Sequence, residues 1–266
     1  MQKITFLQDN LKEGRIVRWP ENCFPLKFYM APFRWYKAKG EEYKYKQMVL
    51  DALKAWESVG DGSIKFHVVQ SLNDSQVNLE WKRVDRKSLG YCHYHFDNSF
   101  RLYSAEVQIG LSDGLMHQKY MDENEVYHTI LHEIGHSLGL GHSSNKEDIM
   151  YTPHQYGVTK IARGDKETLK WLYRFPCGAT AKDISNAYSM HTDDIDEVVK
   201  KLTQNKPISK FEEVKNGIVM PEKDLLEEQT RIAELNKYNL ALQNIQISKE
   251  IEQFIKRPPN INPKKI

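Results

Sequence analysis

The chain's 266 residues can form one sizeable hydrophobic core, or one core with an appendage. Its 38 Lys and Arg nearly balance its 36 Asp and Glu, and the net charge of +2 gives no reason to expect a nucleic acid or an anionic membrane as the main partner. No apolar run approaches the roughly 18 residues of a membrane span, and three cysteines are too few for a disulfide framework.

Strand-like and helical patterns alternate along the first part of the chain. Pro25 to Ala31 is an apolar, aromatic-rich run that predicts a strand. Glu41 to Val59 has apolar residues three and four positions apart, which predicts an amphipathic helix. Further strands are predicted at Ile64 to Val69, at Val77 to Trp81 and at Ala105 to Leu111.

Two more helices complete this part. Arg83 to Tyr103, between the last two strands, is expected to be irregular. Glu125 to Leu138 predicts an amphipathic helix that Gly139 ends, and Asp165 is expected to cap a final helix through Tyr173. This order of elements predicts an α/β fold, or α+β in the broader sense, with a small mixed sheet.

The composition changes near Pro176, after which the chain contains no tryptophan and reads as polar and helical. We therefore predict one domain over residues 1–176 and a helical C-terminal region of unknown role over 177–266. Within that region helices are predicted at 182–190, at 193–202 with Thr192 as its cap, and, as a long amphipathic segment, at 224–255.

One short run carries the chemistry of a metal site: His132-Glu133-Ile134-Gly135-His136-Ser137-Leu138-Gly139-Leu140-Gly141-His142. His132 and His136 are one helical turn apart and project from the same face. Gly139 can adopt a positive φ where the chain must turn, which lets His142 return as a third ligand. Three imidazoles leave one tetrahedral position for water, and this is the pattern of a catalytic zinc site.

Glu133 directly follows the first ligand and is the expected general base. Zinc lowers the pKa of a bound water from about 15.7 towards roughly 7, and Glu133 can accept the proton of that water. The same carboxyl group can then pass the proton to the leaving amine. A bare HExxH match has a real false-positive rate, but the added glycine, the third histidine and the helical context make this match specific. The sequence therefore predicts hydrolysis of peptide bonds with one catalytic Zn²⁺.

The long histidine motif followed by a methionine turn resembles the signature of the metzincins. Asp148-Ile149-Met150-Tyr151 supplies the turn, with Met150 beneath the metal. Within that clan the chain resembles the matrixins, the matrix-metalloproteinase-like peptidases of family M10. The resemblance covers about residues 15 to 175 and implies a zincin-like fold with an active-site helix and a terminal helix. It also implies a substrate pocket walled by Tyr151, Pro153 and Tyr156.

The resemblance has departures. Animal matrixins also carry a structural Zn²⁺ and Ca²⁺ ions before the active-site helix, where this chain has His93, His95 and Asp97. The matching strand at Ala105 to Ile109 lacks the expected histidine, so a surface or hydrogen-bonding role is favoured for the three residues. The latency motif of a matrixin propeptide is not seen. Buried thiols, a Cys23–Cys177 bridge and a thiolate that caps the zinc all remain open.

The preferred interpretation is an active endopeptidase whose substrate lies extended along an edge strand near Ala105 to Gly110. A zinc-containing protein-binding module is the alternative. In a third interpretation the C-terminal helix docks over the cleft and keeps the enzyme latent, although the same helix could instead bind a partner. Met1 to Asn10 has no apolar stretch of signal-peptide length, so both a cytoplasmic location and secretion after removal of an export signal stay open.

Overall fold

The structure, a computed structural model, describes residues 3–33, 41–82, 89–110, 122–153, 155 and 157–204. The chain divides into two compact units, Met1–Pro207 and Ile208–Ile266, and all the described residues belong to the first. The first unit thus continues past Pro176, where the sequence predicts a boundary. The helix predicted at 224–255, and any docking through it, lie outside the described residues.

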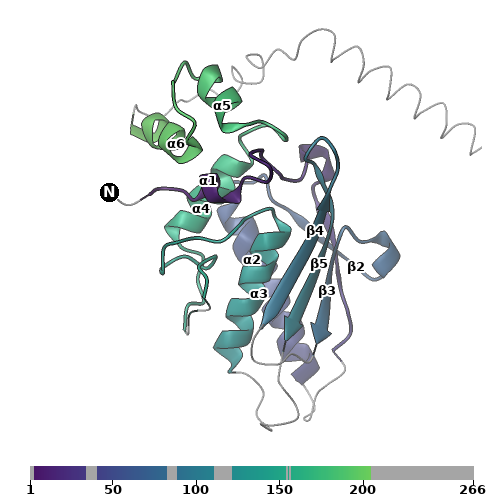
Figure 1. The fold of residues 1–266 in the computed structure, drawn as a ribbon. Coiled ribbons are helices and arrows are strands. Elements are labelled where there is room, and N and C mark those ends of the chain that lie inside the picture. Colours follow the sequence, from purple (N-terminus) through teal and green to yellow (C-terminus); the bar gives the residue numbers. More distant parts are fainter. Residues whose placement is uncertain are drawn as a thin grey trace, which may run out of the picture. The chain divides into compact units, whose positions relative to one another are not determined.

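A five-stranded mixed sheet forms the centre of this unit (Figure 1). Its strands are β1 (Leu26–Met30), β2 (Phe66–Val69), β3 (Val77–Lys82), β4 (Gly90–Phe96) and β5 (Leu102–Gly110), in the order β2-β1-β3-β5-β4. All neighbouring pairs are parallel except β4 and β5. Buried residues alternate along β3, with Val77, Leu79 and Trp81 on the core face, as a half-buried strand requires. The predicted α/β class with a mixed sheet is confirmed.

Two expectations about this sheet are wrong. Gly90–Phe96 is a regular strand rather than part of an irregular stretch. Because β4 pairs on the outer side of β5, one edge of the sheet is β4, and β5 lies inside the sheet between β3 and β4. A peptide that adds a strand there must therefore pair with β4 and not with residues 105–110.

Helices α2 (Glu41–Val59) and α3 (Glu123–Ser137) pack on each other, and α3 lies on β4 and β5 (Figure 1). Three buried or half-buried aromatic side chains fix α3 by donating hydrogen bonds to its carbonyl oxygens. Trp56 Nε1 donates to Leu131 at 3.0 Å, Trp19 Nε1 to Ser137 at 2.7 Å, and the Tyr173 hydroxyl to Leu138 at 3.0 Å. The last two bonds satisfy carbonyl groups at the helix end that have no partner within the helix.

The remaining helices are short, and they are α1 (Leu7–Asn10), α4 (Arg163–Leu172), α5 (Ala181–Ala187) and α6 (Ile195–Gln204), with 3₁₀ turns at Glu21–Cys23 and Leu72–Asp74. The helices predicted after Asp165 and after residue 181 are confirmed, but their predicted caps are wrong. Asp165 is the third residue of α4 and accepts from the N–H of the cap residue Ala162 at 2.8 Å. Asp194, not Thr192, accepts from the first N–H groups of α6.

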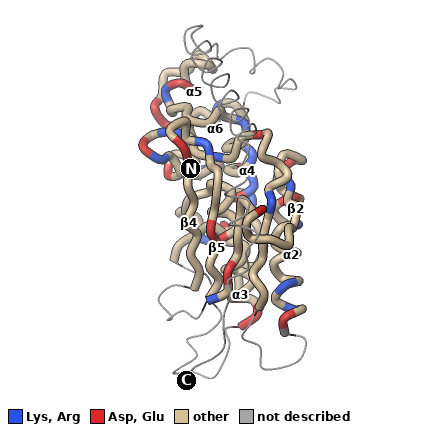
Figure 2. Tube along the Cα trace, turned by 90° about the vertical axis from the view of Figure 1, so that its right-hand side faces the viewer, with Lys and Arg blue, Asp and Glu red and all other residues tan. Residues whose placement is uncertain are grey.

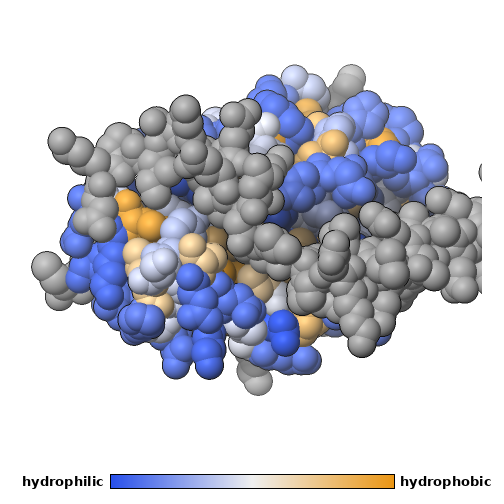
Figure 3. Space-filling view, turned by 90° about the horizontal axis from the view of Figure 1, so that it is seen from above, coloured by the Kyte–Doolittle hydropathy of each residue, from blue (hydrophilic) through white to orange (hydrophobic). Residues whose placement is uncertain are grey.

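Helices α5 and α6 belong to the same hydrophobic core as the sheet, because Ile184, Ile195, Val198 and Val199 are all buried in it. Seen from the end that carries these helices, the described surface is largely hydrophilic, with small separate hydrophobic patches (Figure 3). Acidic and basic positions are interspersed along the elements (Figure 2). No helix among the described residues is both long and apolar enough to cross a membrane.

Candidate metal centre

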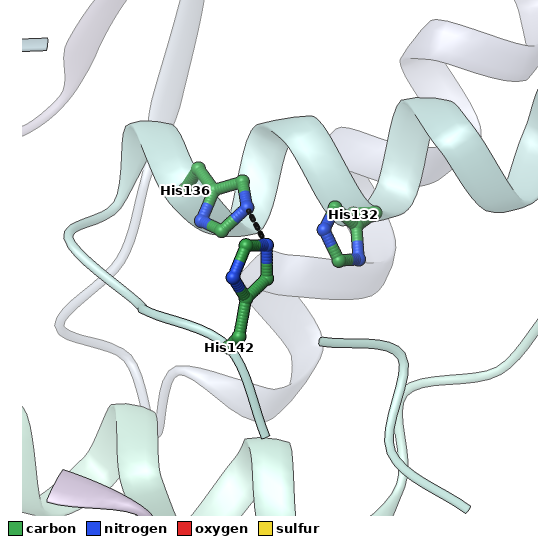
Figure 4. A group of neighbouring side chains, drawn as sticks. All are labelled: His132, His136 and His142. Atoms are coloured by element: carbon green, nitrogen blue, oxygen red, sulfur yellow. Dashed lines mark hydrogen bonds between the residues drawn. The ribbon is translucent and has the colours of Figure 1, made fainter. Parts of the chain in front are cut away.

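Three imidazole rings converge at the C-terminal end of α3. His132 and His136 lie on the helix, and His142 approaches from the loop that follows it (Figure 4). One ring nitrogen of each residue lies within 4.8 Å of the corresponding atoms of the other two, and Nε2 of His136 is 3.2 Å from Nε2 of His142. Among the described residues this is the one group of three or more side chains that could hold a metal ion.

Backbone carbonyl groups set the tautomers of the two helical histidines. Nδ1 of His132 is 2.7 Å from the carbonyl oxygen of Ile149, and Nδ1 of His136 is 2.7 Å from that of Leu140. A carbonyl oxygen only accepts hydrogen bonds, so each Nδ1 must carry the proton and each Nε2 must present a lone pair. Burial first, and the neighbouring His132 second, lower the pKa of His136 to about 3. His136 is therefore neutral, which is the form of imidazole that binds metal ions.

The turn that returns His142 needs two residues without side chains. Gly139 has φ +93°, as the sequence predicts, and a Cβ atom there would lie 2.9 Å from the carbonyl oxygen of Val17. A Cβ atom on Gly141 would collide with the side chain of Asn10. The close approach of residues 10 and 17 therefore shapes the loop between the second and third histidines.

Glu133 lies beside the three histidines and is almost fully buried. Its Oε2 atom has no hydrogen-bond partner among the described residues. Burial alone raises the pKa of this carboxyl group to about 8. A Cβ atom on Gly90 would lie 2.7 Å from Oε1 of Glu133, so the glycine at the start of β4 leaves room for the carboxyl group. The arrangement is that of a group able to exchange a proton near neutral pH.

Met150 lies directly under the helix. Its thioether sulfur packs so closely against Gly135 that no Cβ atom would fit there. The turn around it is held by Asp165, which accepts from the N–H of Ile149 at 2.8 Å and from that of Met150 at 3.1 Å. Burial raises the pKa of Asp165 to about 7, against the effect of these N–H donors. The same turn supplies the Ile149 carbonyl group that orients His132, so Asp165 acts on the metal site through the turn.

A cleft of about 750 Å³ opens onto the histidines and Glu133. Tyr151 and Pro153 line it, while Tyr156 lies outside the described residues. His128 also lines it, buried one turn before His132, with Nδ1 2.6 Å from the Val158 carbonyl oxygen. The role of Tyr151 and Pro153 as a specificity pocket stays a prediction.

Several cleft residues were not predicted from the sequence: Asp9, Lys12, Gly90, Cys92, Tyr94 and Thr129. Thr129 lies one turn before Glu133, so its helical spacing was a usable signal. Nothing local marks Asp9 and Lys12, which lie more than a hundred residues before the motif.

Of the other residues singled out by the sequence, Cys92 lines the cleft, whereas His93, His95, Asp97, Cys23 and Cys177 do not. His93 and His95 stack with Tyr91 and Tyr103 across β4 and β5. The carboxylate of Asp97 binds Arg101, whose Nε is 2.9 Å from Oδ2. Cys23, Cys92 and Cys177 are free thiols, and burial raises the pKa of each, most strongly for Cys92.

Comparison with known proteins identifies the family of this chain. The family model of the matrixins matches residues 19–174, the span that carries the sheet, α3 and α4. The chain belongs to the matrixin family. A matrixin of this kind is expected to be a peptidase and to use zinc.

Two relatives of the chain are viral proteins. One from Trichoplusia ni ascovirus 2c is 29% identical over 140 residues, which cover 45% of this chain and 26% of the relative. One from Heliothis virescens ascovirus 3e is 27% identical over 153 residues, 50% of this chain and 32% of the relative. Both carry the name "putative matrix metalloproteinase". The match therefore spans about a quarter to a third of the length of these relatives.

Proposed function

We propose that the protein is a zinc-dependent metalloendopeptidase, with His132, His136 and His142 as ligands of one Zn²⁺. The observation that carries the proposal is the convergence of three imidazoles beside a buried carboxyl group in one open cleft. Nitrogen ligands in this number leave a coordination position for water or substrate. When bound, zinc would acidify a water molecule and polarise the scissile carbonyl group.

Glu133 is the proposed general base and acid. Its carboxylate accepts a proton from the attacking water and gives that proton to the nitrogen of the leaving amine, so that the C–N bond breaks and two peptide ends form. Burial raises the pKa of this carboxyl group, which strengthens it as a proton acceptor. The Oε2 atom, which lacks a partner among the described residues, is free to make these contacts.

The proposed substrate is an extended peptide. The edge of β4 that faces away from β5 can pair with such a peptide through main-chain hydrogen bonds, and Gly90, Cys92 and Tyr94 of this strand line the cleft. The proposed pocket beside the metal is formed by Tyr151, Pro153 and Tyr156. Pairing with β4 makes no demand on the substrate's side chains, so selectivity must come from the cleft walls.

The test compares the parent with Glu133→Ala. Zinc content is measured in both, and both are incubated with an unfolded protein with and without a chelator. We expect cleavage by the parent, its loss with the chelator, and a rate about 10²–10⁴-fold lower for the variant at equal zinc content. Glu106→Ala is the matched control, because Glu106 is exposed on β5 and does not line the cleft.

A different outcome would favour the alternative function. If the parent binds one zinc ion and cleaves no protein or peptide, the full chain is not an active endopeptidase. The site would then be part of a zinc-containing binding module, or of a latent enzyme. Removal of residues 208–266, the second compact unit, would separate the two, because only a latent enzyme would gain activity.

A further inference from the structure

The segments on either side of the matrixin match bind each other beside the cleft. Asp196 of α6 accepts from the Thr5 hydroxyl at 2.7 Å and from the N–H of Leu7 at 2.8 Å. The N–H of Phe6 donates to Thr168 Oγ1 on α4 at 3.1 Å. These bonds, all buried, join residues more than 160 positions apart and hold the start of the chain against α4 and α6.

A second set of bonds fixes the next few residues. Lys12 and Arg15 exchange both backbone hydrogen bonds, at 3.0 and 2.9 Å, across Glu13 and Gly14, whose φ angles of 52° and 74° form a tight hairpin turn. The N–H of Ile16 donates to Ala179 at 3.0 Å, and the N–H of Gly178 donates back to Ile16 at 2.8 Å. The backbone of Lys12 is therefore held in place from both sides.

This scaffold presents the side chain of Lys12 to the cleft. Lys12 lines the cleft together with His136, His142 and Tyr94, and its Nζ atom lies 5.8 Å from the centre of the Tyr94 ring. Its charge acts on both histidines and contributes to their lowered pKa values. Within the described ranges no carboxylate forms an ion pair with Lys12. Asp9, the nearby acid of the cleft wall, lies 3.8 Å from Lys3.

We propose that Lys12 is a specificity-determining residue that binds an acidic side chain of the peptide substrate. This inference rests on the proposed endopeptidase function. A peptide paired with β4 would run past Cys92 and then past Tyr94, about 7 Å further along the strand, where Lys12 lies over the ring. An aspartate or glutamate of the substrate at that point would meet the exposed ammonium group of Lys12, which shares the cleft with the third histidine. Lys12 itself, and residues 178 and 179 that bond to the segment after it, lie outside the matrixin match.

The test uses pairs of quenched fluorescent peptides, in which one member of a pair has Glu and the other has Gln at a single position. This position is moved in turn from the third residue before the scissile bond to the third residue after it. We expect one position on one side of the bond where Glu raises kcat/KM about two- to fivefold over Gln, the range of a partly exposed ion pair. This ratio of kcat/KM for the Glu peptide to that for the Gln peptide should fall to about one in Lys12→Gln and persist in Lys12→Arg. In Lys12→Glu it should fall below one, and a peptide with Lys at the same position should be preferred. It should also shrink at high salt.

Controls separate the subsite from general effects. Lys65→Gln makes the same charge change at an exposed residue next to β2, the strand at the opposite edge of the sheet from β4. This variant should keep the parent's ratio. Zinc content and melting temperature verify that each variant is folded. Peptide binding is also measured without cleavage, by fluorescence anisotropy. The affinity of each peptide is compared between the Glu133→Ala variant and the double variant Glu133→Ala, Lys12→Gln.

The outcomes are distinct. Cleavage without any Lys12-dependent preference for acidic peptides, in rate or in affinity, would overturn the subsite and leave the endopeptidase standing. If the parent cleaves nothing but binds acidic peptides more tightly through Lys12, the endopeptidase proposal fails and the subsite stands as part of a binding cleft. If neither cleavage nor Lys12-dependent binding is found, both proposals fail.

Discussion

At the scale of single residues, Asp165 holds the turn that contacts the candidate metal site. Its buried carboxyl group accepts from three backbone N–H groups, those of Ile149, Met150 and Ala162. It thereby holds the turn whose Ile149 carbonyl group fixes the ring of His132. Residues that orient metal ligands in this way typically change metal affinity by about 10–100-fold when removed.

We therefore expect Asp165→Ala to lower both stability and zinc affinity. Leaving buried N–H groups without an acceptor costs about 1–3 kcal/mol each, so a loss of roughly 3 kcal/mol or more is expected in urea unfolding. Asp165→Asn keeps one acceptor oxygen and should lie between the parent and Asp165→Ala. Asp74→Ala, at an exposed acid far from α4 in the sequence, is the control. Unchanged zinc affinity in Asp165→Ala would show that the turn does not orient His132.

The residues that sequence reasoning found are those whose roles follow from local geometry. One helical turn separates His132 from His136, and Gly139 marks the reversal, so the convergence of the three histidines can be predicted without knowing the rest of the fold. The role of Asp165 could not be predicted, because it depends on a contact with the turn at Ile149. Read locally, the same aspartate looks like an ordinary helix cap.

At the scale of elements, β4 shows why a strand can escape prediction. Tyr91, His93 and His95 point to the exposed side, while Cys92, Tyr94 and Phe96 pack towards the core. Both sets contain aromatic rings, so the alternation has little contrast in hydrophobicity, and only pairing with β5 reveals the strand. Because β4 is not predicted from the sequence, the edge of the sheet, and with it the expected path of the substrate, is assigned to β5 instead of β4.

Also at this scale, α6 should control the order of the first residues. In Asp196→Ala, the Thr5 hydroxyl and the Leu7 N–H lose their shared acceptor. We expect faster hydrogen exchange across residues 3–16 and a fall in the preference for acidic peptides towards the value of Lys12→Gln. Glu197→Ala removes an exposed carboxylate from the same helix and should change neither. Exchange rates equal to those of the parent would contradict a clamp at Asp196.

At the scale of the whole molecule, the described unit is larger than the composition indicates. The polar, tryptophan-free sequence after Pro176 predicts a separate region, yet Ile184, Ile195 and Val198 are buried in the common core. The composition of a segment averages over all the residues of its helices, whereas burial depends on the few apolar residues, three and four positions apart, that form one face of each helix. Such a short amphipathic helix cannot reveal from its sequence which surface it covers.

Metal binding should also be measurable in the stability of this unit. A ligand present at a hundredfold excess over its Kd stabilises the folded state by about 2.7 kcal/mol, which corresponds to a rise in Tm of about 5–10 °C for a domain of this size. We expect the zinc-loaded protein to lose this amount when a chelator is added, as followed by calorimetry. His136→Ala should melt at the lower temperature with or without chelator. Equal melting temperatures for the loaded and chelated parent would argue against a metal held by the three histidines.

The two indole groups that hold α3 give the protein its own optical probe. Trp19 and Trp56 are fully buried, and their N–H groups are bonded to carbonyl oxygens on successive parts of the helix that carries Glu133. Any displacement of that helix must alter the surroundings of at least one indole. The difference in emission between the parent and the Trp19→Phe and Trp56→Phe variants isolates these two among the five tryptophans of the chain, and would therefore follow movements of α3 in real time and without an attached dye.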